Sequence, residues 1–372
     1  MAQGFSLKDH LFNAETVGLL GQHFEEAGVF ASAPFVSDVL RDMGPLELKA
    51  RINLIADVLA RYLPADFPQA AAAILRALPP PLDPDRTDDD FGHFIYAPLG
   101  VFVETHGLED HRDLGLDLIE ALTQRFSMEF SIRAFLNRWP EETLARMQDW
   151  AGHPNYHVRR LVSEGTRPRL PWGQGIGIGH DRTLPLLDRL HADPTRFVTR
   201  SVANHLNDVA RTDPDAVIGR LAAWQAEGRQ TEKELLWMRT HALRNLIKSG
   251  YPPALSHLGY DAGAEVIIDR FALAPQRLAR GGTAKIEIAL TVPARTPLII
   301  DYVIDFAKAG GKSSPKVFKL KTLTAKAGQK IALQKTHHFK DDATTYRLHP
   351  GAHRLGLQIN GRIRATLDFT LT

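Results

Sequence analysis

Hydrophobic residues recur every three or four positions along the first two thirds of the chain, with polar residues between them. This spacing puts the apolar side chains of segments such as 13–28 and 45–63 on one face of a helix. The segment 78–90, rich in proline and aspartate, interrupts the pattern, which resumes at 111–126 and 127–139. The sequence therefore predicts a long series of amphipathic helices with an exposed loop at 78–90.

Three short motifs begin 40 residues apart within these helices: HVRRLV at 157, FVTRSV at 197 and WMRTHAL at 237. A period of about 40 residues is typical of HEAT-like repeats, in which helical pairs stack because one pair cannot bury its own apolar face. Three short matches can also arise by chance. Together with the helical pattern, they favour a HEAT-like superhelix, whose concave side could hold an extended ligand.

In the last third of the chain the hydrophobic period changes from about 3.6 residues to 2, the period of a β-strand. Residues 284–292 alternate between apolar and polar, and the stretch Ile363–Leu371 does the same. Asn360-Gly361 has the composition of a tight hairpin turn. About seven such strands fit between residues 263 and 371, as in an immunoglobulin-like (Ig-like) sandwich.

The predicted fold class is therefore α+β and multidomain. We expect residues 1–258 to form an all-α HEAT-like repeat superhelix and residues 262–372 to form an all-β Ig-like sandwich. A length of 372 residues agrees with two domains, because it exceeds the usual size of one.

Composition narrows the class of protein further. The chain has no cysteine, no run of about eighteen apolar residues, and no basic-then-apolar start of the signal-peptide kind. We therefore expect a cytoplasmic protein without disulfides or a membrane span.

Charge is distributed unevenly along the chain. Residues 1–124 carry a net charge of −12, residues 125–248 one of +5, and residues 262–372 one of +10. In the middle segment, 17 of the 19 basic residues are arginine. An acidic start followed by a basic remainder favours a polyanionic partner. The alternative is that the pattern serves solubility alone.

Glu129 stands in an apolar and aromatic stretch, RFSMEFSIRAFL, that we expect to be helical. A buried carboxylate is costly unless it is paired. Arg125 and Arg133, four residues to either side, would share its helix face and could pair with it there. The residues alone leave a structural ion pair and a carboxylate that works on a ligand equally open.

Glu164 ends a predicted helix, one turn after Arg160, and is followed by the loop GTRPRLPW. Arg160 could pair with it, and the glycine after it suits a left-handed helix stop. Two prolines stiffen the segment that carries Arg167, Arg169 and Trp172. Rigid loops that present guanidinium and indole groups are suited to gripping phosphates and stacking on bases or sugars.

Residues 201–215 continue the polar pattern, with Asn204, Asn207 and Asp208 on a predicted helix that begins near Arg200. Helix capping and turn formation would explain these residues, and so would contacts with phosphate groups.

We expect neither a metal ion nor a cofactor. His153 and His157 have the spacing of a zinc-binding helix, but no acidic third ligand follows at a suitable distance. The glycines of 172–179 lack the lysine and the strand–turn–helix setting of a nucleotide-binding loop.

The sequence resembles the DNA alkylation-repair glycosylases built from HEAT-like repeats, specifically the AlkC type with a C-terminal Ig-like domain. The resemblance covers essentially the whole chain and rests on FSLKDHLFN, FSMEFSIRAFL, HPNYHVRRLVSEGTRPRLPW, ANHLNDVARTDPD and HHFKDD. It implies hydrolysis of the N-glycosidic bond of alkylated bases in duplex DNA, above all 3-methyladenine and 3-methylcytosine, which leaves an abasic site for base excision repair. It also implies excision without flipping the base into a pocket.

The resemblance further implies roles for individual residues. Glu129 and Glu164 match the family's catalytic carboxylates, Arg160 would hold a phosphate or orient Glu164, and Trp172 would lie against the deoxyribose of the lesion. We expect the DNA to be contacted by the residues Arg159, Arg160, Arg167, Arg169, Arg200, Asn204, Asn207 and Asp208.

In the sandwich, the basic loop 308–316, with Lys308, Lys312 and Lys316, and the polar segment 337–354 are expected to contact the duplex as well. The expected protein is thus a monomer that acts on alkylated duplex DNA in the bacterial cytoplasm, at the nucleoid. Two alternatives stay open: a non-catalytic HEAT-repeat DNA-binding or scaffold protein, and a helical-repeat protein that binds RNA.

Overall fold

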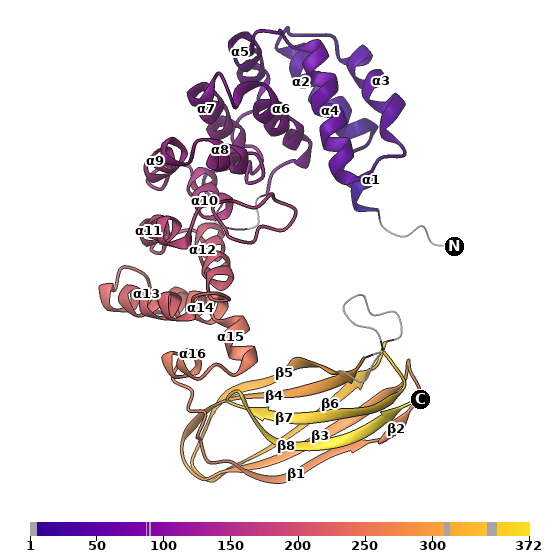
Figure 1. Ribbon diagram of the computed structural model, residues 1–372, viewed down its shortest axis with the longest axis vertical. Coiled ribbons are helices and arrows are strands. Elements are labelled where there is room, and N and C mark those ends of the chain that lie inside the picture. Colours follow the sequence, from indigo (N-terminus) through magenta and orange to yellow (C-terminus); the bar gives the residue numbers. More distant parts are fainter. Residues whose placement is uncertain (1–5, 87, 89–90, 309–312, 341–347) are drawn as a thin grey trace. The chain divides into compact units, whose positions relative to one another are not determined.

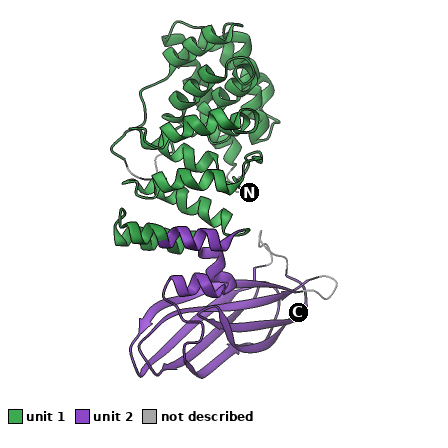
Figure 2. Cartoon of the chain, turned by 60° about the vertical axis from the view of Figure 1, so that its left-hand side comes forward, with its two compact units in different colours: residues 1–212, 223–242 green, residues 213–222, 243–372 purple. Residues whose placement is uncertain are grey.

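A series of helices precedes a β-sandwich along the chain (Figure 1). The computed structural model describes residues 6–372 except 87, 89–90, 309–312 and 341–347. The chain forms two compact units, residues 1–212 with 223–242 and residues 213–222 with 243–372 (Figure 2). The predicted class, an all-α part followed by an all-β sandwich, is confirmed.

The helices follow one another with short connections. In chain order they are α1 (Leu7–Leu11), α2 (Ala14–Glu26), α3 (Ser32–Met43), α4 (Leu48–Tyr62), α5 (Phe67–Ala77), the 3-10 helix η1 (Phe94–Tyr96), α6 (Ala97–Gly107), α7 (Arg112–Thr123), α8 (Ile132–Arg138), α9 (Pro140–Trp150), α10 (Tyr156–Gly165), α11 (His180–Leu190), α12 (Arg196–Val209), α13 (Pro214–Glu227), α14 (Glu232–Ala242), α15 (Arg244–Ser249) and α16 (Pro252–His257).

Local capping fixes where some of these helices begin. The side chain of Asn13 accepts hydrogen bonds from the backbone N–H groups of Glu15 and Thr16, and the Thr16 hydroxyl accepts one from the backbone of Asn13. This reciprocal capping box satisfies donors that a helix start leaves free. Asp66 caps α5 in a similar way through the N–H of Gln69.

The helix predicted for 127–139 is wrong in its first part, because α8 begins only at Ile132. Phe126 forms an isolated antiparallel bridge with Gly92, and its ring packs 4.7 Å from that of Phe94. Serine and phenylalanine are weak helix formers, so these contacts prevail over the helical period. Glu129 therefore lies in a turn and not on a helix face.

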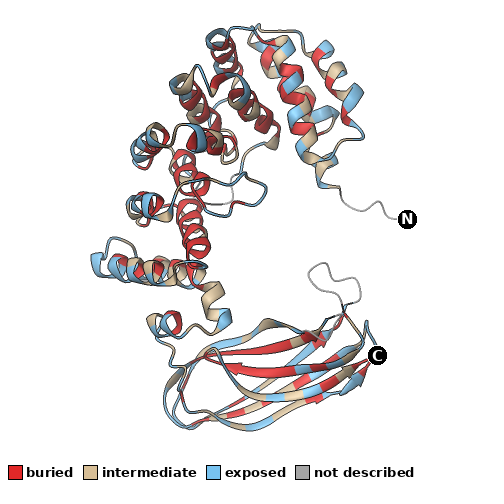
Figure 3. Cartoon of the chain, viewed as in Figure 1, coloured by how far each residue is buried: buried red, intermediate tan, exposed pale blue. Residues whose placement is uncertain are grey.

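The three motifs spaced 40 residues apart mark repeated helices. They lie in α10, α12 and α14, and α12 packs against both of the others. Leu161 of α10 and Val202 of α12 are fully buried, as is most of each of these two helices (Figure 3). The predicted helical repeat is confirmed here.

Two sheets form the sandwich, with strand orders β1-β3-β6 and β2-β8-β7-β4-β5. Every neighbouring pair is antiparallel except β2 and β8. The strands are β1 (Ile267–Ala274), β2 (Arg277–Leu278), β3 (Thr283–Val292), β4 (Thr296–Ala307), β5 (Ser313–Ala325), β6 (Gln329–His338), β7 (Gly351–Ile359) and β8 (Arg362–Leu371).

The alternation in the sequence predicts most of the sandwich core. The apolar positions of 284–292 lie between the sheets, each at most 3% exposed. On β8, Phe369 and Leu371 are buried, whereas Ile363 is 48% exposed. The prediction is wrong at Ile363, which directly follows the turn, next to a shift in the β7–β8 register.

The predicted hairpin turn at Asn360-Gly361 is confirmed, since both residues have positive φ, 45° and 77°. The Asn360 side chain accepts from the N–H of Ile299 at 2.8 Å and donates to the carbonyl of Asp261 at 2.8 Å. A Cβ at Gly361 would lie 2.5 Å from the Cα of Gly250, in the turn after α15. The turn is thus fastened to the helical segment before the sandwich, while the division into 1–258 and 262–372 stays a prediction.

We expect Gly361→Ala to lower the free energy of unfolding by about 3 kcal/mol, because it adds a clash to the strain of a positive φ. Gly328→Ala is the matched control in the same sandwich: its φ is 72°, but no atom lies within 4 Å of the added Cβ. It should cost only about 1 kcal/mol. Urea unfolding of both variants measures the difference, and equal losses would contradict the close contact.

Candidate active site

Helix α10 and the loop that follows it, residues 166–179, carry the predicted site. The helix ends at Gly165, and Thr166 caps it with φ −93° and ψ 3°. The predicted left-handed stop at Gly165 is therefore wrong. A Cβ at Gly165 would lie 2.6 Å from Cγ2 of Ile132, so glycine is required for the close packing of α10 on α8.

One guanidinium connects the two predicted catalytic carboxylates. Arg160 Nη1 lies 2.9 Å from Oε2 of Glu129, and Nη2 lies 3.6 Å from Oε2 of Glu164. The Ser127 hydroxyl completes the first contact, since it accepts from Arg160 at 3.0 Å and donates to Glu129 at 2.8 Å. The partner of Glu129 is thus Arg160, and not Arg125 or Arg133 as the helical spacing predicts.

Both oxygens of Glu164 are occupied. Oε1 accepts from Arg167 at 2.6 Å, and Oε2 accepts from the Ser201 hydroxyl at 2.6 Å. Arg167 also donates to Asp208 at 3.0 Å, which ties the loop to α12. Burial acts to raise the pKa of Glu164, but Arg160 and Arg167 outweigh it and hold that pKa below its usual range. Glu164 is therefore a fixed anion.

Glu129 is less enclosed. Its side chain is 17% exposed, against 6% for Glu164. Within the part of the chain that the structure describes, both hydrogen bonds to Glu129 end on Oε2, and Oε1 receives none. An anionic oxygen without an internal donor is available to a ligand or to a water molecule.

Both acids line a cavity of about 370 Å³ together with Arg160, Arg167 and Trp172. Much of the remaining wall is aromatic, from Phe91, Phe94, Phe126, Phe130 and Phe197. The Arg160 guanidinium lies 4.4 Å from the ring centroid of Phe197. Such walls lower the local dielectric and strengthen the charge pairs inside.

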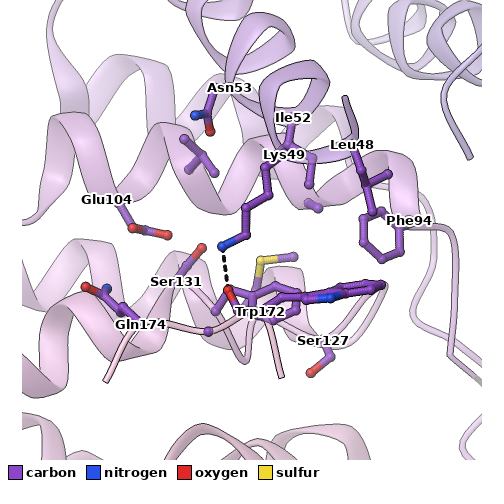
Figure 4. A pocket seen from close by; sticks show the side chains of 15 residues that line it. Leu48, Lys49, Ile52, Asn53, Phe94, Glu104, Ser127, Ser131, Trp172 and Gln174 are labelled. Carbon is purple, nitrogen blue, oxygen red and sulfur yellow. Dashed lines mark hydrogen bonds between the residues drawn. The ribbon is translucent and has the colours of Figure 1, made fainter. Parts of the chain in front are cut away.

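Trp172 lies at the rim between this cavity and a second one of about 280 Å³, since it lines both. Its side chain is exposed, at 57%, and its φ of 65° is left-handed. Figure 4 shows the second cavity, where Lys49 Nζ donates to the carbonyl of Trp172 at 2.6 Å. The predicted exposed indole is therefore presented by a strained backbone.

Several residues predicted to bind DNA have partners within the protein. Arg159 pairs with Asp193 at 2.5 Å, and Arg200 pairs with Asp88. The Asn204 carbonyl oxygen lies 2.9 Å from Nε2 of His241. Contacts of these three residues with DNA stay predictions.

The remaining predicted residues differ in exposure. Asn207 is only 2% exposed and has no hydrogen bond to Oδ1 among the described residues, whereas Arg169 is exposed on the loop. Lys308 is exposed at the end of β4, and Lys316 lies 5.5 Å from the ring of Phe318. Lys312 lies outside the described residues.

Two further searches cover only the described chain. No group of three or more His, Cys, Asp or Glu side chains there could hold a metal ion. His153 instead accepts from the N–H of Asn155 at 3.0 Å and lies 3.3 Å from Glu120. None of the described helices combines the length and the apolar character that a membrane crossing needs.

Known proteins resemble this chain over nearly all of its length. The uncharacterized protein YhaZ of Bacillus subtilis is 31% identical over 364 residues, which cover 96% of this chain and 98% of YhaZ. The structure of Pseudomonas fluorescens alkylpurine DNA glycosylase AlkC, bound to DNA containing an abasic site analog, matches with a TM-score of 0.87. That match is 30% identical in sequence and covers 99% of this chain and 100% of AlkC. This chain belongs to the AlkC and YhaZ family.

Residues 267–372 match the family model described as the C-terminal Ig-like domain of uncharacterised protein YhaZ. The Ig-like character predicted for the sandwich is thereby confirmed. In this AlkC-family chain the match begins at the first residue of β1.

The site also contains residues that the sequence did not single out. Ser127 and Ser201 hold the carboxylates, Phe197 covers Arg160, and Lys49 reaches the loop from a position 123 residues away. Serines and a distant lysine carry no local pattern that marks them. Phe197 alone had a signal, because it opens the second of the three repeated motifs.

His205 of α12 supports the site from below. Its Nδ1 lies 3.1 Å from the carbonyl oxygen of Ser163, and its Nε2 lies 3.3 Å from the Thr183 hydroxyl. Burial lowers the pKa of His205 to about 4, and Arg167 lowers it further than burial alone would. The imidazole is therefore neutral in the folded protein at neutral pH.

This neutrality predicts a pH dependence of stability. The unfolded chain takes up the proton near pH 6.5, whereas the native state takes it up only near pH 4. His205 should thus lower the free energy of unfolding by about 3 kcal/mol as the pH falls between these values. Urea unfolding of the wild type and of His205→Gln between pH 7.5 and 4 measures this, and the variant should lack that part of the slope. Parallel curves would contradict a neutral imidazole.

Proposed function

We propose that this protein is a DNA glycosylase of base excision repair. It hydrolyses the N-glycosidic bond of cationic alkylated bases, 3-methyladenine and 3-methylcytosine, in duplex DNA without base flipping, and leaves an abasic site. One observation carries the proposal: Glu129 and Glu164 share the guanidinium of Arg160 beside an exposed Trp172. The family member AlkC, named an alkylpurine DNA glycosylase, supports it.

The chemistry of the lesion explains what such a site must supply. A 3-methylated base is already cationic, so it departs with the electrons of the C1′–N bond and needs little acid catalysis. Positive charge then builds on the deoxyribose, and a carboxylate beside the sugar stabilises it. Opposite charges about 4 Å apart attract by about 4 kcal/mol at an effective dielectric of 20, or about a thousandfold in rate.

The hydrogen bonds divide the work between the two carboxylates. Glu129 Oε1, which receives no hydrogen bond from the described residues, faces the sugar and accepts a proton from the water that attacks C1′. Glu164 is saturated by Arg167 and Ser201, and it fixes Arg160 in place. Since both groups act on the sugar, the reaction needs no pocket that encloses an extruded base.

DNA binding would fall to basic groups at the surface. Arg169 is exposed on the loop that carries Trp172, and Lys308 is exposed in the sandwich. Arginines committed to internal carboxylates, such as Arg159, have less to offer a phosphate. Phosphate contacts of this kind hold the duplex without reading its sequence.

We expect Glu129→Gln to reduce the single-turnover release of 3-methyladenine from methylated duplex DNA by about 10²- to 10³-fold. Its affinity for abasic-site DNA and its thermal stability should change little, because the amide keeps the shape of the side chain. Glu164→Gln should lose both rate and stability, by about 3 kcal/mol, since Arg160 and Arg167 lose a buried partner. Glu109→Gln, at an exposed pair with Arg138, is the control that should keep both.

Released base is measured by chromatography with a chelator present. If Glu129→Gln and Glu164→Gln fold, bind DNA and release base at the parental rate, the two acids are structural and the scaffold alternative stands. If binding favours RNA over methylated DNA, the RNA-binding alternative replaces the proposal.

The sandwich lysines give a separate expectation. Replacing Lys308, Lys312 and Lys316 by alanine should weaken DNA binding and flatten the plot of log affinity against log salt by about 2 to 3, one per lost phosphate contact. Lys326→Ala with Lys330→Ala, at the other end of β5, is the control and should leave the slope unchanged. Fluorescence anisotropy at several salt concentrations measures both, and equal slopes would remove these lysines from the interface.

A further inference from the structure

Arg133 of α8 is a buried arginine with an unusual set of partners. It is 1% exposed and donates to the backbone carbonyls of Gly165 and Arg167, each at 2.8 Å, and of Gln174. Within the described chain it has no carboxylate at ion-pair distance. Burial lowers the pKa of Arg133 to about 10, so the guanidinium is still charged at neutral pH.

These carbonyls bracket the loop that follows α10. Gly165 and Arg167 lie at its start, and Gln174 lies just beyond Trp172. Asn137, one helical turn after Arg133, donates to the carbonyl of Gly175 at 2.9 Å. A planar guanidinium with several fixed donors can hold two chain segments at a set separation.

Lys49 provides a third fastening, at the tip of the loop. Its ammonium donates to the carbonyl of Trp172, as the dashed line in Figure 4 shows. Trp172 has a φ of 65°, a conformation that a bulky residue adopts only at a cost. The fastenings by Arg133 and Lys49 offset that cost and keep the indole at the rim of the acid-lined cavity.

We propose that Arg133 is a positioning residue for base excision, which sets the loop so that Trp172 and the Arg167–Glu164 pair keep one geometry. The inference rests on the proposed function, because it assigns Trp172 to the lesion sugar. Arg133 touches neither acid. It acts through the backbone of Arg167, whose side chain holds Glu164 at 2.6 Å, and through the backbone on both sides of Trp172.

The test compares Arg133→Lys with a control of equal burial. Lysine keeps the charge but cannot reach three carbonyls in a plane. A loop displaced by about 1 Å would reduce the single-turnover rate by about ten- to a hundredfold, with a less than threefold change in affinity for abasic-site DNA. Arg51→Lys is the control: Arg51 is 3% exposed and donates to the carbonyls of Phe12 and Leu46, away from the loop. It should lower stability and keep the rate.

A spectroscopic readout separates positioning from general destabilisation. The fluorescence of Trp172, taken as the difference between each protein and its Trp172→Phe form, should shift in emission and acrylamide quenching with Arg133→Lys but not with Arg51→Lys. Lys49→Met should produce a similar shift, and it replaces Arg133→Lys if that variant does not fold.

Parental excision and an unchanged Trp172 signal in Arg133→Lys would overturn the inference. So would a loss of rate that Arg51→Lys matches at equal stability. If the wild type excises no base, the proposed function fails by itself, and the inference, which rests on it, is overturned with it.

Discussion

The contact on which the site depends is the one between Arg160 and two carboxylates, because neither acid could stay ionised in an aromatic cavity without it. Glu129 and Glu164 come from segments 35 residues apart in the chain and meet at a single guanidinium. Removing two charges from water costs several kcal/mol each, and only close pairing with further hydrogen bonds recovers that cost. Ser127 and Ser201 supply those bonds, so the acids are held charged before any substrate arrives.

Pairing of this kind also orders the surroundings. Arg167 joins Glu164 to Asp208, which fastens the loop after α10 to the next repeated helix, α12. The repeat architecture therefore contributes more than a scaffold, since each inner helix supplies one member of the charge network. A site preorganised in this way need not rearrange when positive charge forms on a sugar, and that is the main source of electrostatic catalysis.

Residues with a local pattern could be predicted from the sequence, and residues that act at a distance could not. The alternation in β3 and the Asn360-Gly361 turn are properties of neighbouring residues, and the structure confirms them. The turn at Glu129 depends on a bridge between Phe126 and Gly92 that no periodicity records, so the helix predicted there is wrong. The motif around Glu164 drew attention to the right loop. Its partners on α12 and the reach of Lys49 are tertiary facts, which pair spacing in one sequence does not contain.

The same network limits what the internal arginines can do for DNA. Arg160 and Arg167 are balanced by Glu129, Glu164 and Asp208, so the site presents little net positive charge to a phosphate. Attraction for a polyanion must then come from groups outside the network, such as Arg169 and the lysines of the sandwich, whose segment carries a net charge of +10. Charge for binding and charge for chemistry are thus kept in different places. A surface that attracts the duplex can be strongly basic without neutralising the carboxylate that faces the sugar.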